Sequence, residues 1–100
     1  TNPQSTMQIA DLKIDFAGRE VSINQEVINL RTQEFEVLSV LAQNKGIVLS
    51  REQLLNKAWG YDFYGQTRTV DVHIAQIRRK LADSQIKIET VTGIGYKLVA

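Results

Sequence analysis

Residues 67–81 read Thr67-Arg-Thr-Val-Asp-Val-His-Ile-Ala-Gln-Ile-Arg-Arg-Lys-Leu81, and this stretch decides the fold. Its aliphatic residues recur at intervals of four, three and four, so one stripe of a helix would carry Val70, Ile74, Ile77 and Leu81. At about 100° per residue, these four side chains lie within about 60° of one another. The pattern predicts an amphipathic helix that begins near Thr67 and packs this stripe into a core.

The opposite side of this helix lacks the long lysine and glutamate side chains that are usual on a solvated surface. It carries Arg68, Val72, Ala75, Gln76 and Arg79, with Thr69, His73 and Lys80 on one flank and Asp71 and Arg78 on the other. A valine gains nothing from water, whereas in a DNA major groove it can contact a thymine methyl group; Gln76 can pair with adenine, and Arg79 with guanine or a phosphate. The pattern favours a DNA-reading helix. The alternative is a partly covered face with incidental residues.

The composition of the whole chain sets further limits. One hundred residues with 43% hydrophobic and 23% charged residues are typical of one small globular domain. The absence of cysteine excludes disulfides and thiolate metal sites, and no apolar run reaches the roughly 20 residues of a membrane span. Residues 1–50 hold four basic and six acidic residues, and residues 51–100 hold eight and five. This asymmetry points to a polyanionic partner on one face.

The first half of the chain predicts a small sheet followed by a helix. Apolar and polar residues alternate in short bursts over residues 7–30, which predicts three or four short antiparallel strands with one buried face. Thr32 is the expected N-cap of a helix over about residues 33–44, with Glu34 in its first turn. Asn44-Lys45-Gly46 is expected to supply a basic last turn and a glycine stop.

A second helix and a C-terminal hairpin complete the expected elements. Ser50 and Gln53 have the spacing of a capping box, and Leu49 and Leu54 have that of a hydrophobic staple. This helix is expected to end at Gly60 and to be followed by an aromatic loop over residues 61–66. Residues 86–99 alternate around a glycine-containing turn, which predicts a β-hairpin.

Four blocks in this order and spacing resemble the winged-helix effector domain of OmpR/PhoB-type response regulators. They are Thr32–Leu38, Ser50–Gly60, Arg68–Ile74 and Thr90–Tyr96, and the resemblance covers about residues 8–99. It implies an α+β winged helix-turn-helix with a small N-terminal antiparallel sheet, three helices and a C-terminal hairpin wing. Residues 1–6 are then expected to be a linker or a disordered end, residues 7–100 the domain, and a receiver domain to precede them outside this chain.

The resemblance also implies a function. Proteins of this kind are cytoplasmic bacterial regulators in two-component phosphorelay systems, and they bind double-stranded promoter DNA site-specifically to control transcription. Their partners are a sensor histidine kinase acting through the receiver domain, RNA polymerase, and a second protomer bound head-to-tail on direct repeats. No cofactor, metal, membrane or enzymatic activity is expected. The alternative is a winged-helix protein-interaction module without DNA binding.

The resemblance and the residue chemistry together name the candidate site residues. Residues expected to face bases are Thr69, Val72, Ala75, Gln76 and Arg79. Residues expected at phosphates are Arg51, Trp59, Arg68, His73, Arg78, Lys80, Thr90, Thr92 and Tyr96. The loop expected to face polymerase or a neighbouring protomer is Tyr61, Asp62, Phe63, Tyr64, Gly65 and Gln66.

Several of these residues have a plain structural alternative. Arg51 could form a surface ion pair, Trp59 and Tyr96 could be mainly core residues, and loop residues 61–66 could be packed down. His73, the single histidine, cannot build a multi-histidine metal site, and it binds a phosphate or is a half-exposed structural residue.

The chain departs from its relatives at three positions. Some relatives have arginines at the positions of Ala75 and Gln76, and many insert an arginine into the minor groove from the position of Thr92. Their absence predicts a preference for A/T-rich half-sites, read more through apolar contacts and DNA shape.

Overall fold

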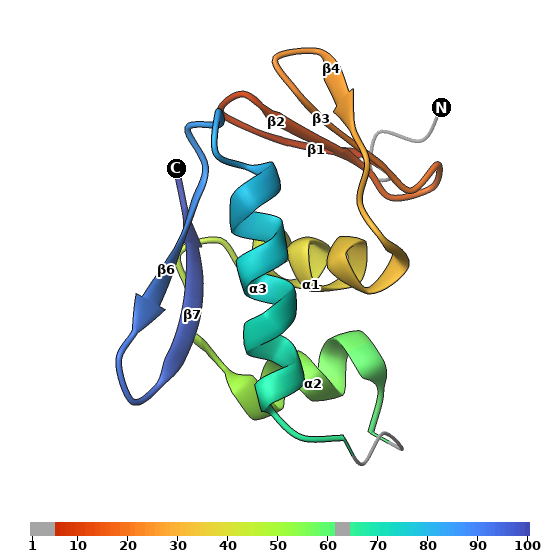
Figure 1. Cartoon of the computed structure of the whole chain (residues 1–100). Helices are drawn as coiled ribbons and strands as arrows, with labels where there is room; N and C mark the ends of the chain where they lie inside the picture. Colours follow the sequence, from red (N-terminus) through yellow and green to blue (C-terminus); the bar gives the residue numbers. More distant parts are fainter. Residues whose placement is uncertain (1–5, 62–64) are drawn as a thin grey trace.

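The computed structural model describes residues 6–61 and 65–100, which form two small sheets around three helices (Figure 1). The N-terminal strands are β1 (Thr6–Ile9), β2 (Leu12–Asp15), β3 (Glu20–Ile23) and β4 (Glu26–Ile28). They are followed by α1 (Thr32–Gln43), β5 (Leu49–Ser50), α2 (Arg51–Trp59), α3 (Arg68–Lys80), β6 (Lys87–Val91) and β7 (Gly95–Val99). The predicted order of sheet, helices and hairpin is confirmed. Residues 1–5 of the expected linker lie outside the described residues, whereas Thr6, which was also expected in the linker, is the first residue of β1 and pairs with Asp15.

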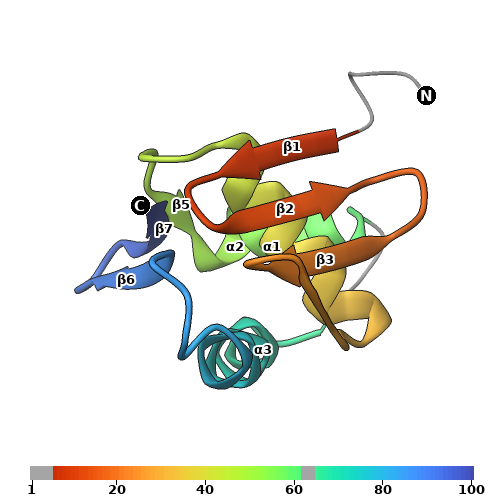
Figure 2. The ribbon, with the colours of Figure 1, turned by 90° about the horizontal axis from the view of Figure 1, so that it is seen from above.

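The four N-terminal strands form an antiparallel sheet in the order β1-β2-β3-β4. Met7 pairs with Ile14, Ile14 with Val21, and Val21 with Ile28, so the apolar positions of neighbouring strands fall on one face. Ile14 and Val21 are fully buried. This confirms the predicted strands with one buried face. The sheet lies over α1, and α3 is seen end-on beside it (Figure 2).

Helix α1 begins and ends slightly differently from the prediction. Thr32 is the first helical residue and not the N-cap, because the carboxylate of Glu34 accepts the backbone N–H of Arg31 at 2.9 Å and fixes the start one residue earlier. The helix ends at Gln43, so Lys45 lies beyond it and the last turn carries no basic residue. Gly46 has a positive φ of 80° and donates its N–H to Leu98 O at 2.9 Å, which ties the end of α1 to β7.

Helix α2 has the predicted ends. The Ser50 hydroxyl accepts the Gln53 N–H at 3.0 Å, and the Gln53 side chain accepts the Ser50 N–H at 2.8 Å. These bonds form the expected capping box and satisfy backbone donors that a helix start leaves unpaired. Leu49 and Leu54 are both buried, and the helix is capped by Gly60 at a φ of 99°.

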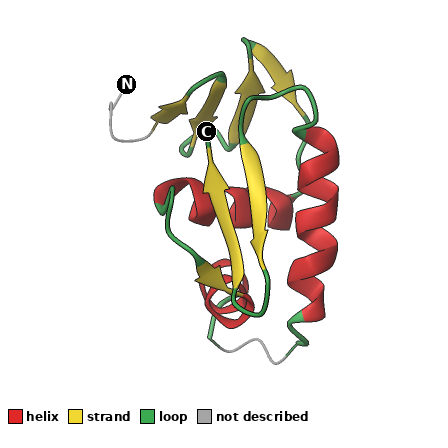
Figure 3. Cartoon of the chain, turned by 90° about the vertical axis from the view of Figure 1, so that its left-hand side faces the viewer, coloured by secondary structure: helices red, strands yellow, loops and turns green. Residues whose placement is uncertain are grey.

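The second sheet joins the hairpin to the helices. Its strand order is β5-β7-β6, with Leu49 opposite Tyr96 and Ser50 opposite Gly95. A Cβ at position 95 would overlap the carbonyl oxygen of Leu49, so glycine is required for β7 to approach β5. Figure 3 shows the resulting hairpin standing beside α3, with α1 behind it. The predicted hairpin is confirmed, and its base is fixed against the start of α2.

Candidate nucleic-acid interface

Helix α3 has two distinct faces. Its inner stripe is Val70, Ile74, Ile77 and Leu81, each between 0% and 3% exposed. On the other side, Val72 is 54% exposed and Ala75 is also exposed, although both are apolar. Seen along its axis in Figure 2, α3 lies at the margin of the molecule, and the other labelled elements lie on its inner side. The predicted stripe is confirmed, and the small apolar residues are open to a partner.

The remaining residues predicted to face bases, and Arg68, which is predicted to bind a phosphate, lie on or beside this outer face. Arg68 and Arg79 are exposed, and Thr69 and Gln76 are half-buried. Together with Val72 and Ala75 they form a surface of short side chains with arginines near both ends of the helix. We call this surface, residues 68, 69, 72, 75, 76 and 79, the outer face of α3.

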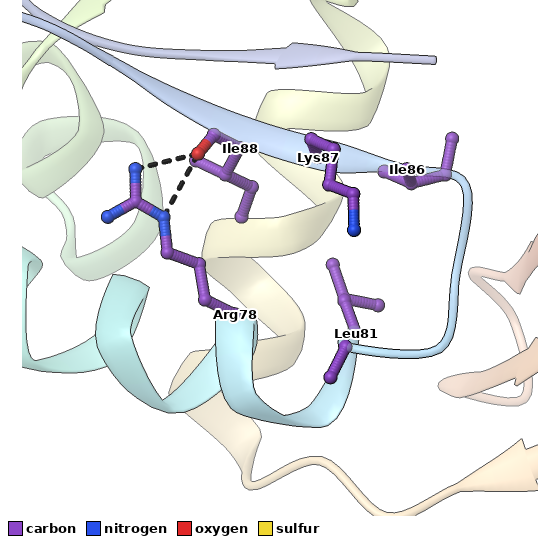
Figure 4. Close-up of a pocket in the computed structure, with 6 residues that line it drawn as sticks. Arg78, Leu81, Ile86, Lys87 and Ile88 are labelled. Atoms are coloured by element: carbon purple, nitrogen blue, oxygen red, sulfur yellow. Dashed lines mark hydrogen bonds between the residues drawn. The ribbon is translucent and has the colours of Figure 1, made fainter.

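Arg78 has partners within the protein that the sequence did not predict. Its Nε and Nη2 donate to the carbonyl oxygen of Ile88 at 3.0 and 2.6 Å (Figure 4). Nη2 also donates to the Thr90 hydroxyl at 2.7 Å. Its guanidinium carbon lies 5.5 Å from the centre of the Tyr96 ring. Ile88 and Thr90 belong to β6, an edge strand with unpaired backbone groups. Arg78 therefore links α3 to the edge of the wing, and Thr90 takes part in the same link.

A second link joins α2, α3 and β7 at Asp71. A single carboxylate oxygen of Asp71 accepts two hydrogen bonds, one from Arg51 Nε at 2.8 Å and one from the Tyr96 hydroxyl at 2.5 Å. Burial raises the pKa of Asp71, but these two hydrogen bonds and the positive charges of Arg51 and Arg68 together hold the pKa below its ordinary value. Burial, and then the bond to Asp71, raise the pKa of Tyr96. The ion-pair alternative for Arg51 and the core alternative for Tyr96 are therefore both observed.

Lys80 is directed toward the protein interior rather than along the outer face. Its Nζ lies 2.6 Å from a carboxylate oxygen of Glu34, whose residue is only 2% exposed. Burial raises the pKa of Glu34, and the bonds from Lys80 and from the Arg31 N–H lower it below the ordinary value. This pair joins the last turn of α3 to the first turn of α1.

Trp59 and His73 meet at the end of α2. Their rings are in an edge-to-face arrangement, with centroids 4.9 Å apart and planes at 83°. His73 Nδ1 lies 2.8 Å from the Thr69 carbonyl oxygen, which requires a proton on Nδ1. In the neutral ring Nε2 is then an acceptor, so a phosphate contact through Nε2 needs the protonated imidazolium.

The loop and the wing tip complete the candidate residues. Tyr61 is 78% exposed, Gly65 is half-buried and Gln66 is exposed, whereas Asp62, Phe63 and Tyr64 lie outside the described residues. At the wing tip Thr92 is exposed. Ile94 beside it is also exposed and was not among the predicted site residues. Within residues 6–61 and 65–100, no helix has the length and apolar character that a bilayer span requires.

The partners in these three links were not identified by sequence reasoning, and the links share one property. The residues that they join are separated by between 10 and 46 positions in the chain. Asp71 and Glu34 carried no signal for these roles, because each looks like an ordinary acidic residue in the first turn of a helix.

Comparison with known proteins identifies the family. The family model described as "Transcriptional regulatory protein, C terminal" matches residues 24–98. The transcriptional regulatory protein VxrB of Vibrio cholerae is 46% identical over 96 residues, which are 96% of this chain and 38% of that protein. PrrA of Mycobacterium tuberculosis is 41% identical over 100 residues, which are 98% of this chain and 43% of that protein. The chain spans about two fifths of the length of these relatives.

Similar solved structures are also DNA-binding domains or homologues of response regulators. The DNA-binding domain of Klebsiella pneumoniae RstA, in complex with the RstA box, has a TM-score of 0.82 and 34% identity, covering 94% of this chain and 96% of that one. The DNA-binding domain of Escherichia coli CpxR has a TM-score of 0.83 and 32% identity, covering 95% and 96%. Thermotoga maritima DrrB, an OmpR/PhoB homologue, has a TM-score of 0.84 and 35% identity, covering 96% and 45%.

The element order, the open outer face of α3 beside the hairpin wing, and these matches agree with one another. The chain therefore belongs to the family of C-terminal domains of transcriptional regulatory proteins, as an OmpR/PhoB-type winged-helix DNA-binding domain of a response regulator.

Proposed function

We propose that this domain recognises promoter DNA by placing α3 in the major groove and the β6–β7 hairpin along the flanking minor groove. The observation that carries the proposal is the outer face of α3, where Val72 is 54% exposed on a rigid helix. A major groove admits one α-helix, and short side chains let the helix approach the base edges closely.

The outer face supplies candidate base contacts. Val72 and Ala75 can contact thymine methyl groups, and Gln76 can make two hydrogen bonds to adenine. Thr69 can bond to several base edges, and Arg79 can reach a guanine or a phosphate. We infer a half-site rich in A and T, because no arginine stands at positions 75 and 76.

The predicted phosphate contacts fall into two groups. Arg68, Arg51 and Thr92 are exposed, and Trp59 and His73 are half-buried where the end of α2 meets α3, and we assign these five as phosphate ligands. Four further residues have hydrogen bonds that join α3 or the wing to another element, and we assign them the task of holding α3 and the wing in place: Arg78, Lys80, Thr90 and Tyr96.

The full-length protein is proposed to act as relatives of this family do. The relatives are more than twice as long as this chain, which supports a domain that begins at β1 and is joined through the residues before it to a receiver domain. In this proposal a cognate sensor histidine kinase phosphorylates the receiver, and two protomers bind direct repeats head-to-tail. The loop at residues 61–66 contacts RNA polymerase or the neighbouring protomer. The protein is cytoplasmic and has no enzymatic activity.

Selection of random duplex DNA by this domain, followed by a salt titration of affinity for the enriched sequences, tests the proposal. We expect an enriched half-site, repeated at about 10–11 base pairs, with affinity that falls steeply with salt. A receiver-containing protein serves as the second reagent if the isolated domain binds weakly. If neither protein enriches any sequence, the proposal is wrong and the protein-interaction module becomes the better explanation.

A further inference from the structure

We propose that Asp71 is a positioning residue for DNA binding, and that its carboxylate holds the guanidinium of Arg51 in the orientation that meets a DNA phosphate. The inference rests on the proposed function, because it assumes that DNA lies against the outer face of α3. It adds a role for an acidic residue on a helix that faces a polyanion.

The geometry at Arg51 shows an ion pair that orients the guanidinium but leaves most of its N–H donors available to a ligand. Arg51 is the first residue of α2, and its Nε donates to Asp71 at 2.8 Å. A guanidinium has five N–H donors in one plane, and the bond from Nε uses one of them. The Arg51 side chain is 51% exposed, so the ion pair leaves much of the group accessible to a ligand. The planar geometry of the group suits a phosphate.

Tyr96 anchors the other side of the same carboxylate. Its hydroxyl donates to the same Asp71 oxygen at 2.5 Å, while its residue is 5% exposed and packs in the core. Asp71 is therefore held by a residue that cannot move freely, and Arg51 is held by Asp71. The three residues come from β7, α3 and α2, which are the wing, the DNA-reading helix and the helix that precedes it.

This chain of contacts has a consequence for binding free energy. A free arginine side chain loses rotamer freedom when it binds a phosphate, and that loss weakens the contact. At Arg51 part of this freedom is already lost in the folded protein. The hydrogen bond from Tyr96 also partly offsets the negative charge of Asp71, and this reduces the repulsion between Asp71 and the phosphates.

Two possible roles for Asp71 predict changes in DNA affinity of opposite sign when Asp71 is replaced, which makes the proposal testable. If Asp71 is only a negative charge near DNA, replacing it with asparagine removes repulsion and tightens binding. If Asp71 positions Arg51, the same replacement releases Arg51 and weakens binding. The effect must then depend on the presence of Arg51.

The experiment measures the affinity and salt dependence of the domain for its selected duplex, with Asp71→Asn, Arg51→Ala and the double variant compared. We expect Asp71→Asn to weaken binding about three- to fivefold, the range of a partly exposed ion pair. Arg51→Ala should reduce the salt slope by about one unit, as for one lost phosphate contact. Adding Asp71→Asn to Arg51→Ala should then cause no further loss.

Two further variants keep the result interpretable. Tyr96→Phe removes only the hydroxyl and should weaken binding in the native background but not in the Asp71→Asn background. Asp83→Asn is the matched control, because Asp83 is an exposed acidic residue just beyond α3 and outside this cluster. Its replacement should leave affinity unchanged or slightly higher. Thermal unfolding of each variant separates loss of folding from loss of binding.

The outcomes separate this inference from the proposed function. Equal or tighter binding by Asp71→Asn overturns the positioning role, and so does a loss of the same size with and without Arg51, which would indicate a purely structural carboxylate. If the unmodified domain and its receiver-containing form select no DNA at all, the proposed function fails, and this inference fails with it.

Discussion

The inner and outer faces of α3 differ in what fixes their residues. On the inner face, Ile74 and Ile77 are almost completely buried, and packing against the other helices and the sheets sets their size and shape. On the outer face, Val72 is 54% exposed in the free protein, and only a partner can cover the exposed half of its surface. The difference teaches that stability and recognition share one helix but lie on separate sides, so substitutions two residues apart should have unrelated effects.

The largest expected effect is on the inner face. Ile77→Ala should lower the free energy of unfolding by about 2–5 kcal/mol, because it leaves a cavity in a packed core. Denaturant unfolding measures this change. Val72→Ala is the control on the outer face and should change stability by no more than about 0.5 kcal/mol. An equal loss for both variants would show that the two faces are not distinct.

A smaller loss of stability is expected at the inner flank of α3. Lys80→Met removes the cation that pairs with buried Glu34, and we expect a loss of about 1–3 kcal/mol, the cost of an unsatisfied buried group. Lys97→Met is the matched control, because Lys97 lies 3.9 Å from an exposed partner, Glu89. It should have little effect.

The same pair predicts a pH dependence. Because the pKa of Glu34 is lowered in the folded protein, its contribution to stability is present above its ordinary pKa of 4.5 and is lost as pH falls through the folded value. In Lys80→Met the buried Glu34 carboxylate has lost its cation, so protonation of Glu34 at low pH removes the free-energy cost of burying its charge. The difference in stability between the two proteins should therefore narrow below about pH 4.5. A difference that is constant from pH 7 to pH 3 would contradict the assignment.

On the outer face, Gln76→Ala is expected to change recognition rather than stability. The loss should be confined to one base position and amount to about 1–3 kcal/mol of discrimination if Gln76 pairs with adenine. Binding to a set of single-base variants of the selected site measures it. Gln43→Ala, at an exposed position on α1, is the control that should leave the preference unchanged. An unchanged preference for the Gln76 variant would remove it from the base-reading set.

The smallest and least specific effect is expected at the end of the outer face. Arg68→Ala should weaken binding to all sequences alike and reduce the slope of log affinity against log salt by about one unit. Lys13→Ala, at an exposed position in the N-terminal sheet, should leave that slope unchanged. A changed sequence preference for the Arg68 variant would instead mean that Arg68 contacts a base.

Local patterns predicted most of the fold because their signals are short in range. The capping box at Ser50 and Gln53 spans four positions, and the inner stripe of α3 follows from helical periodicity alone. The start of α1 was misplaced at Thr32, since Glu34 accepts the backbone N–H of Arg31 and no side-chain cap is needed there. The correct start of α2 and the misplaced start of α1 both depend on contacts between residues only a few positions apart in the chain.

The site was predicted less completely, because several of its side chains also bind distant parts of the protein. Arg78 was predicted to bind a phosphate, and its guanidinium is bonded to Ile88 and Thr90 of the wing. Lys80 was assigned a similar role, and its ammonium group is paired with Glu34 of α1. The sequence shows that a side chain is basic, but it does not show whether that side chain forms a hydrogen bond or ion pair with a distant part of the chain.

The sequence by itself determined the elements, the buried stripe of α3 and the short, partly apolar outer face, since periodicity and end signals act over a few residues. Only the tertiary structure decided which polar residues remain available to DNA and which hold α3 against its neighbours. Asp71 shows why: its two partners, Arg51 and Tyr96, lie 20 and 25 positions away. They meet at one carboxylate oxygen only because α2, α3 and β7 pack together.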